Sequence, residues 1–381
     1  MIIIFVKNEF KDTFFVAYFQ QSFSIFTDMN SDFYFIIGLM SGTSLDGIDL
    51  VYVQFDKKEY KNFKILASDT ISYPDYWREK LKLAIDFSTD ELKDLDITYG
   101  KLLGDEINLF IKKNKIKNVD FIASHGHTIL HQPDEGITLQ IGNGKVISDI
   151  TNQQVICDFR TQDVQLGGQG APLVPIGDEL LFVNYDFCVN LGGFANVSFK
   201  EKDKRIAFDI CPVNIVLNHY VQKLGFEYDD KGKIAFGGKI NNVLLDKLNA
   251  LEFYKKTPPK SLGLEWVQEK ILPIIDELET DIPSILRTFI EHSAIQIGKI
   301  IYKNESVLLT GGGVFNDFLM RRIEFHSKRK VKIQSSKLIN YKEALIFAFL
   351  GLLRAENQVN CLKSVTGATK NHSSGMIFNP S

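Results

Sequence analysis

The chain has 381 residues, and its 44 lysines and arginines against 47 aspartates and glutamates give a formal net charge of -3. Because single hydrophobic cores stop growing below this length, two domains are expected. The nearly balanced charge offers no electrostatic footprint for nucleic acid. The four cysteines are far apart and form no CxxC pair, which argues against a zinc site or a disulfide framework and favours buried thiols in a reducing cytoplasm.

Residues 1–33 are interpreted as an N-terminal extension. The segment is rich in Phe and Ile, but charged residues interrupt it from Lys7 onward, and it holds no apolar run of about 20 residues that could span a bilayer. It also lacks the order of an export signal, in which positive charges precede an apolar stretch. No membrane partner is therefore expected, and a translation start at Met29 is a hypothesis that would leave the extension outside the native chain.

The first strong motif is a loop of glycines, hydroxyls and acids between two apolar strands, the second of which runs from Leu50 to Phe55. Glycine lets backbone N–H groups approach an anion closely, and neighbouring hydroxyls add donors. Carboxylates at Asp46 and Asp49 can organise Mg²⁺, which prefers oxygen ligands. The alternative is an ordinary hairpin with a polar turn. The predicted phosphate loop consists of Gly42, Thr43, Ser44, Leu45, Asp46, Gly47, Ile48 and Asp49.

A histidine-rich segment, Ser124–Pro133, follows two stretches of helical periodicity at Trp77–Phe87 and Thr98–Lys113. A His-x-His pair with a further histidine at 131 is one pattern of a zinc site, but no nearby Cys, Asp or Glu completes the ligand set. A sugar-binding loop fits the segment equally well. The candidate sugar contacts are His125, His127 and Thr128.

The segment Asp158–Pro175 combines acids and an arginine with a glycine-rich turn and two prolines. Residues of these types are unfavourable in a hydrophobic core but suit the wall of an active site. The alternative is structural, with Asp163 capping a turn and Arg160 paired with Asp158. The candidate functional residues of this segment are Arg160, Asp163, Gly168 and Gln169.

Two later units repeat the pattern of an apolar strand running into glycines, at 187–198 and 306–316. Neither GxxxxGK(S/T) nor a strand followed by GxGxxG is present, so a nucleotide would have to lie against these bare backbone turns. A tight strand-to-helix turn is the structural alternative for the triple glycine. The candidate nucleotide contacts are Gly192, Gly193, Asn196, Gly311, Gly312, Gly313 and Asn316.

Two further helices are predicted from periodicity, at Pro283–Tyr302 and Tyr341–Arg354. The second is apolar nearly all round, which burial between sheets or at a subunit contact would explain.

The loop at residues 40–49, MSGTSLDGID, resembles the N-terminal signature of the anhydro-N-acetylmuramic acid kinases, a family of the actin-like, sugar-kinase and Hsp70 superfamily. Similar segments continue in the same order as far as residue 369. They lie at Asp209–Asn214, Asp230–Ala235, Pro258–Glu265, Glu343 and Ser364–Ala368. The chain departs from the family pattern at His127, Cys211, Val213 and Leu264.

The resemblance implies an α/β, two-lobed actin-like ATPase (ribonuclease H-like) fold, with a cleft for nucleotide and substrate between the lobes. The two hairpins and the triple glycine would be its two phosphate elements and its adenosine element. Residues 34–145 with 356–381 are expected to form the first lobe, and residues 146–355 the second. A cytoplasmic homodimer is also implied.

The implied reaction uses ATP and Mg²⁺ to convert 1,6-anhydro-N-acetylmuramic acid and water into N-acetylmuramic acid 6-phosphate and ADP, in peptidoglycan recycling and amino sugar catabolism. Asp163 is the expected base for the water, and Glu343 is expected to orient the sugar or the water. The alternatives are a sugar kinase that opens no ring and a non-catalytic, actin-like nucleotide-binding protein. The expected substrate contacts are His125, His127, Thr128, Arg160, Gly168, Gln169, Asp209 and Asn214, with Lys260 and Ser261 as weaker candidates.

Overall fold

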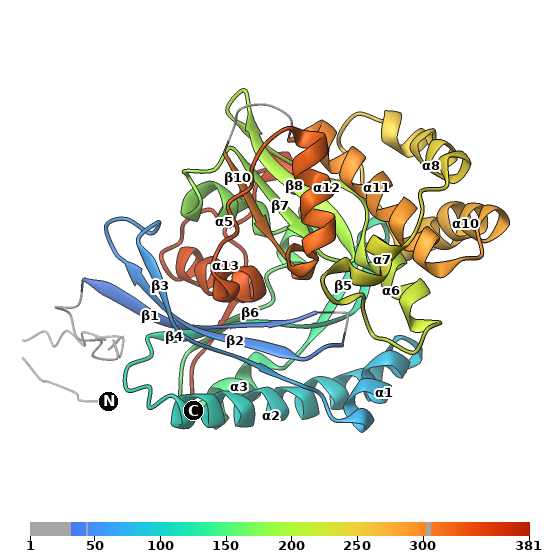
Figure 1. Cartoon of the computed structure of the whole chain (residues 1–381). Helices are drawn as coiled ribbons and strands as arrows, with labels where there is room; N and C mark the ends of the chain where they lie inside the picture. Colours follow the sequence, from blue (N-terminus) through green and yellow to red (C-terminus); the bar gives the residue numbers. More distant parts are fainter. Residues whose placement is uncertain (1–31, 43–44, 302–305) are drawn as a thin grey trace, which may run out of the picture. The chain divides into compact units, whose positions relative to one another are not determined.

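Two β-sheets organise the chain (Figure 1). The computed structural model describes residues 32–42, 45–301 and 306–381, so nearly all of the predicted extension at 1–33 lies outside the described residues. The first sheet has the strand order β11–β6–β4–β1–β2–β3 with β5 beside β4, and the second has the order β10–β7–β8–β9. The strands are β1 Phe33–Ser41, β2 Ile48–Asp56, β3 Phe63–Ile71, β4 Phe121–Gln132, β5 Ile137–Ile141, β6 Val155–Cys157, β7 Phe187–Leu191, β8 Phe194–Glu201, β9 Lys204–Pro212, β10 Val307–Thr310 and β11 Met376–Phe378.

Both sheets are built on the same plan. Strands β1, β2 and β3 form an antiparallel series, and β4 then pairs parallel to β1. Strands β7, β8 and β9 repeat this series, and β10 pairs parallel to β7. The repeat confirms the α/β class and the expected duplication. The lobe boundary at residue 145 stays a prediction, and β6, from beyond it, pairs in the first sheet with β4 and β11.

Apolar side chains cover both faces of the first sheet. In β1, Ile36 belongs to the core on the α13 face, whereas its neighbour Ile37 belongs to the core on the α2 face. A strand buried on both faces has an almost unbroken apolar sequence, as β1 has. The second sheet shares a separate core with α11, to which Phe289 and Ile297 contribute.

The observed helices extend or shorten the predicted ones for identifiable reasons. The helix predicted from Thr98 starts at Thr89, because Ser88 and Glu91 form a reciprocal capping box. The helix predicted at Tyr341–Arg354 starts at Ser336, where the Ser335 hydroxyl accepts the Leu338 N–H at 3.3 Å. The main helices are α1 Asp75–Leu83, α2 Thr89–Lys113, α3 Gly144–Thr151, α4 Thr161–Gln165, α5 Val174–Leu181, α6 Asn214–Gln222, α7 Lys233–Gly237, α8 Asn242–Asn249, α10 Leu272–Leu278, α11 Ile282–Ile300, α12 Asp317–Ser327, α13 Ser336–Ala355 and α14 Lys363–Thr366.

Helix α13 packs on β1, β2 and β4 of the first sheet and also reaches α5 and β10 beside the second (Figure 1). This position accounts for its apolar surface without a subunit contact. A buried ion pair fixes it there, because Lys342 Nζ lies 2.6 Å from the Asp178 carboxylate of α5. Asp178 also accepts the Ser198 hydroxyl of β8. Among the described residues, no helix is both long enough and apolar enough to cross a membrane.

Candidate active site

The loop between β1 and β2 carries the first predicted set. Glycine is required at position 47, because a Cβ there would lie 2.5 Å from the Ile71 carbonyl oxygen of the neighbouring strand. Asp49 accepts the Thr70 hydroxyl at 2.6 Å, and burial together with the nearby Asp46 charge raises the pKa of Asp49. Burial and a second acid both disfavour the charged form of this carboxylate. A nearby cation would favour the charged form, so the site suits a cation. Thr43 and Ser44 lie outside the described residues.

The second hairpin and the triple glycine come together, as the family resemblance implies. The Gly193 carbonyl accepts the Val213 N–H at 2.8 Å, and the Gly192 carbonyl accepts the Asn214 N–H at 3.3 Å, so the turn meets the start of α6. On the other side, Gly311 has a φ of 84°, and a Cβ there would lie 2.5 Å from Asn190 Oδ1. The nearest atom to a Cβ on Gly312 is 3.9 Å away, which leaves that backbone open.

Asn316 continues from the triple glycine as the N-cap of α12, where its side chain accepts the Leu319 N–H at 2.9 Å. Its carboxamide packs so closely on Gly232 that a Cβ there would lie 2.3 Å from Asn316 Oδ1. Beside this contact lies a pocket of about 220 Å³ that the sequence did not reveal. It is lined by Lys231, Gly232, Lys233, Phe236, Asp317 and Arg321.

Two of the predicted substrate residues, His125 and Arg160, contact each other directly. The Arg160 guanidinium donates from Nε to His125 Nε2 at 3.0 Å and from Nη1 to the Gly170 carbonyl at 2.7 Å. His125 is buried, and this burial together with the Arg160 charge holds its pKa well below the usual range. The imidazole is therefore neutral. Asp158 instead accepts the Thr161 N–H at 3.3 Å, so the alternative pairing of Arg160 with Asp158 is not observed.

Of the other predicted residues of β4, His127 contacts a tyrosine cluster. His127 Nδ1 lies 3.1 Å from the Ser41 hydroxyl, which also contacts the hydroxyls of Tyr73 and Tyr99 at 2.6 and 2.8 Å. Burial lowers the pKa of His127 to about 4, so this side chain is neutral in ordinary buffers. Thr128 accepts the Gln140 carboxamide at 3.4 Å. Ser41, Tyr73 and Tyr99 of this cluster were absent from the predicted set.

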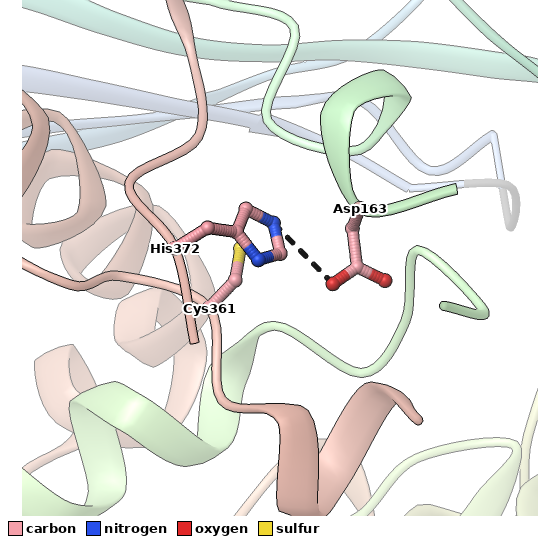
Figure 2. Close-up of side chains that lie close together, drawn as sticks. All are labelled: Asp163, Cys361 and His372. Atoms are coloured by element: carbon pink, nitrogen blue, oxygen red, sulfur yellow. Dashed lines mark ion pairs between the residues drawn. The ribbon is translucent and has the colours of Figure 1, made fainter. Parts of the chain in front are cut away.

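Asp163 is fully buried in α4, and its carboxylate lies next to Cys361 and His372 (Figure 2). Both carboxylate oxygens accept hydrogen bonds. Oδ2 accepts the Gly170 N–H at 2.8 Å, and Oδ1 accepts the Thr366 hydroxyl at 2.7 Å. Gly168 packs against the same carboxylate, since a Cβ on it would lie 2.2 Å from Oδ2. The Gln169 N–H donates to the Thr366 carbonyl at 2.8 Å. The glycine turn and the C-terminal segment thus enclose Asp163.

Glu343 lies in a contrasting position in the second turn of α13, where its side chain is exposed to water. Even so, the surrounding protein raises the pKa of Glu343, while the charges of Lys342 and Arg160 lower it and that of Asp49 raises it again. Charged residues of the first loop, of the α4 segment and of α13 therefore all shift the pKa of the Glu343 carboxylate.

Asp209 and Asn214 support the second hairpin. The half-buried Asp209 carboxylate accepts the Leu262 N–H at 2.8 Å, which places the Lys260–Leu262 segment beside β9, and partial burial raises the pKa of Asp209. Asn196 is the register partner of Asp209 in β8. The Asn214 carboxamide donates to the Leu191 carbonyl at 3.5 Å. These contacts join residues of the predicted nucleotide and substrate sets at the edge of the second sheet.

Comparisons with known proteins match nearly the whole chain. The model of the family described as anhydro-N-acetylmuramic acid kinase matches residues 34–380. The anhydro-N-acetylmuramic acid kinase of Acinetobacter baylyi is 34% identical over 87% of this chain and 96% of its own length. That of Haemophilus influenzae is 33% identical over 90% and 97%. Among solved structures, the activator of 2-hydroxyisocaproyl-CoA dehydratase from Clostridium difficile is 12% identical, with a TM-score of 0.43 over 84% of this chain and 97% of that one.

Proposed function

Because the chain belongs to the anhydro-N-acetylmuramic acid kinase family, we propose that it uses ATP to open and phosphorylate 1,6-anhydro-N-acetylmuramic acid. The observation that carries this proposal is that Glu343 is exposed on α13 while the charges of Arg160 and Asp49 act on its pKa. The Thr70 hydroxyl contacts both Asp49, at 2.6 Å, and Tyr341 of α13, at 3.2 Å. Acids and a fixed arginine from three separate segments supply the groups that a ring-opening phosphoryl transfer needs.

The reaction balances without any further reactant. Water attacks the anomeric carbon, its proton passes to a carboxylate, and the bond between that carbon and O6 breaks. An inverting glycosidase would protonate the departing oxygen with a second acid. Here O6 instead bonds to the γ-phosphorus while the bond to ADP breaks, so one carboxylate acting as base suffices. The products are N-acetylmuramic acid 6-phosphate, ADP and a proton.

Asp163 is the proposed base, and Glu343 the residue that orients the sugar or the water. The Gly170 N–H and the Thr366 hydroxyl hold the Asp163 carboxylate in one orientation, which favours accurate proton abstraction. Since Asp163 is 0% exposed, the water must reach it in the substrate complex as the lobes close over the sugar. Glu343 is the specific alternative, because it is accessible and its raised pKa brings its basicity closer to neutrality.

The phosphates are proposed to lie along the first hairpin. Backbone N–H groups near Gly47 fit an anion, and the Asp49 carboxylate beside Asp46 fits Mg²⁺. When bound, Mg²⁺ would neutralise phosphate charge. Thr70 holds the Asp49 carboxylate in place by its hydrogen bond of 2.6 Å.

The nucleoside end is proposed to lie on the bare backbone of Gly192, Gly193 and Gly312 and to reach the pocket beside Asn316. Glycine leaves this surface free of side chains, and a Cβ on Gly193 would meet no atom closer than 3.7 Å. The pocket adds an exposed aromatic side chain, Phe236, between basic residues. An adenine base can stack on such a ring.

The decisive test is incubation of the full chain with Mg-ATP and 1,6-anhydro-N-acetylmuramic acid in water enriched in oxygen-18. We expect a 6-phosphorylated sugar with the label on the anomeric carbon, detected by mass spectrometry. A phosphorylated sugar that keeps its anhydro bridge would instead establish an ordinary sugar kinase. Nucleotide binding without sugar turnover would establish a non-catalytic protein.

A homodimer in the cytoplasm is the proposed state of the protein. The family resemblance supports the dimer, while α13 no longer does, since its apolar surface is covered within the chain. The four free, buried cysteines suit a reducing compartment. Sedimentation of the purified chain tests the dimer.

A further inference from the structure

Three buried side chains from distant parts of the sequence lie close together: Asp163, Cys361 and His372 (Figure 2). One potential ligand atom from each, a carboxylate oxygen, a thiol sulfur and an imidazole nitrogen, lies within 4.8 Å of the others. Zinc binds oxygen and nitrogen at about 2.0–2.2 Å and sulfur at about 2.3 Å, so a shared ion requires the side chains to close by only about 1 Å.

The backbone holds two of the three side chains in place. Cys361 and His372 face each other in an isolated antiparallel bridge, in which each N–H donates to the other's carbonyl at 3.1 and 3.2 Å. Directly opposite residues of such a pair present their side chains on the same face. Asn360 secures the bridge, since its carboxamide donates to the Ser374 carbonyl at 2.8 Å and accepts the Ser374 N–H at 2.7 Å. The pair is therefore formed before any ion arrives.

His372 has an unfilled position that points at Asp163. Its Nδ1 lies 3.2 Å from the Lys370 carbonyl, which accepts a hydrogen from Nδ1, so that the neutral ring carries its lone pair on Nε2. Nε2 is buried without a hydrogen-bond partner among the described residues, 3.4 Å from Asp163 Oδ1. A lone pair facing a carboxylate is repulsive unless a proton or a cation lies between them. A histidine that binds a metal through one ring nitrogen usually donates the N–H of its other ring nitrogen to a group such as a backbone carbonyl.

We propose that Asp163, Cys361 and His372 form a Zn²⁺ site. On binding, the thiol releases its proton to solvent, and the carboxylate, the thiolate and the neutral imidazole become ligands. The two anionic ligands balance the charge of the ion, which a buried site requires. Three protein ligands leave one position open. Asp163 can still accept its hydrogen bonds from Gly170 and Thr366, because a carboxylate has about four acceptor positions.

Zinc at this site would inhibit the enzyme. A metal-bound carboxylate cannot take the proton of the attacking water, and this consequence rests on the proposed role of Asp163 as base. The binding itself does not depend on that role. The site would thus link phosphorylation of the sugar to the supply of free zinc.

The test uses Co²⁺ as a spectroscopic substitute for Zn²⁺, added to the full chain after treatment with a chelator. We expect one equivalent to produce a thiolate-to-cobalt charge-transfer band that Zn²⁺ abolishes. Cys361→Ser should lose the band. His372→Gln should weaken metal binding by at least about tenfold. Removing only a residue that hydrogen-bonds to a ligand already lowers metal affinity by about that factor, and His372 is itself a ligand. A wild-type protein without the band, or an equal band in Cys361→Ser, would overturn the site.

Cys211→Ser is the matched control, because its Sγ lies 3.9 Å from the Ser293 carbonyl, which can accept a serine hydroxyl instead. Thermal unfolding gives a second readout, since an ion that binds only the folded state raises the midpoint. Zn²⁺ should raise it in wild type and in Cys211→Ser but not in Cys361→Ser. Equal shifts in all three would reject the site. Zinc binding with undiminished turnover would uphold the site and reject Asp163 as the base.

Discussion

Asp163 and Glu343 are carboxylates of the same proposed active site in opposite surroundings. Asp163 is enclosed and has a donor on each oxygen, whereas Glu343 is exposed and is flanked by protein and by charges that shift its pKa. The first arrangement fixes the position of a group, and the second leaves its protonation sensitive to its neighbours. The difference separates a residue suited to accuracy from one suited to regulation by pH.

The largest effect is expected from Asp163→Asn, because a carboxamide cannot accept the proton of the attacking water. Turnover should fall by about 10²–10⁴, the usual contribution of general base catalysis. Nucleotide binding, measured by calorimetry, should be unchanged. Asp158→Asn in the same segment is the matched control, since asparagine can still accept the Thr161 N–H that Asp158 accepts at 3.3 Å.

Glu343→Gln should reduce turnover by less than Asp163→Asn does, and it should change the pH profile. Burial raises the pKa of Glu343, so the wild-type rate falls as the pH drops through that raised value and Glu343 becomes protonated. The variant has no such group, and its profile should lack this acid limb. If Glu343→Gln lost more activity than Asp163→Asn, the roles of the two carboxylates would have to be exchanged.

Arg160→Gln tests the residue that acts on both regions, since its guanidinium donates to the Gly170 carbonyl and its charge lowers the pKa of Glu343. Removing the charge should raise the pKa of Glu343 further and move the acid limb to higher pH. The position of that limb is the readout, whatever the loss in rate. Arg78→Gln, which removes a surface arginine paired with Asp75, should leave the limb in place.

The smallest effect on turnover is expected from Lys342→Met, one residue before Glu343. The substitution leaves the buried Asp178 carboxylate without its partner at 2.6 Å and should lower the free energy of unfolding by about 3 kcal/mol. Thermal unfolding measures the loss. Because the Lys342 charge also lowers the pKa of Glu343, the acid limb should move to higher pH, and turnover per folded molecule above that limb should remain near that of the wild type. Lys337→Met on the exposed side of α13 should change neither quantity.

Local patterns predicted the strands and the glycine turns well, because the motif of strand, glycines and strand specifies a hairpin wherever it occurs. The start of α2 was wrong by nine positions in the sequence, at Thr89 rather than Thr98. The capping box of Ser88 and Glu91 could have located it. Periodicity alone missed that signal because the first turns of α2 are largely exposed.

The surroundings of the site residues were harder to predict, since they depend on contacts between distant segments. The Asp163 partner Thr366 lies in a motif noted from the sequence, but nothing local joins it to α4. The same is true of His372. His127 was expected to contact the sugar. The structure places Ser41 beside its Nδ1, and the sugar contact stays a prediction. The widely spaced cysteines argued against zinc, yet Cys361 lies opposite a histidine that only the fold brings near.

The pairing of β6 with β11 also constrains how the protein is made. β6 is translated early, but its antiparallel neighbour follows only after the entire second sheet, β7 to β10, has been synthesised. Helix α13, which covers one face of the first sheet, is equally late. The half of the molecule that leaves the ribosome first is therefore the half that is completed last, and its unfinished edge must stay soluble throughout the interval.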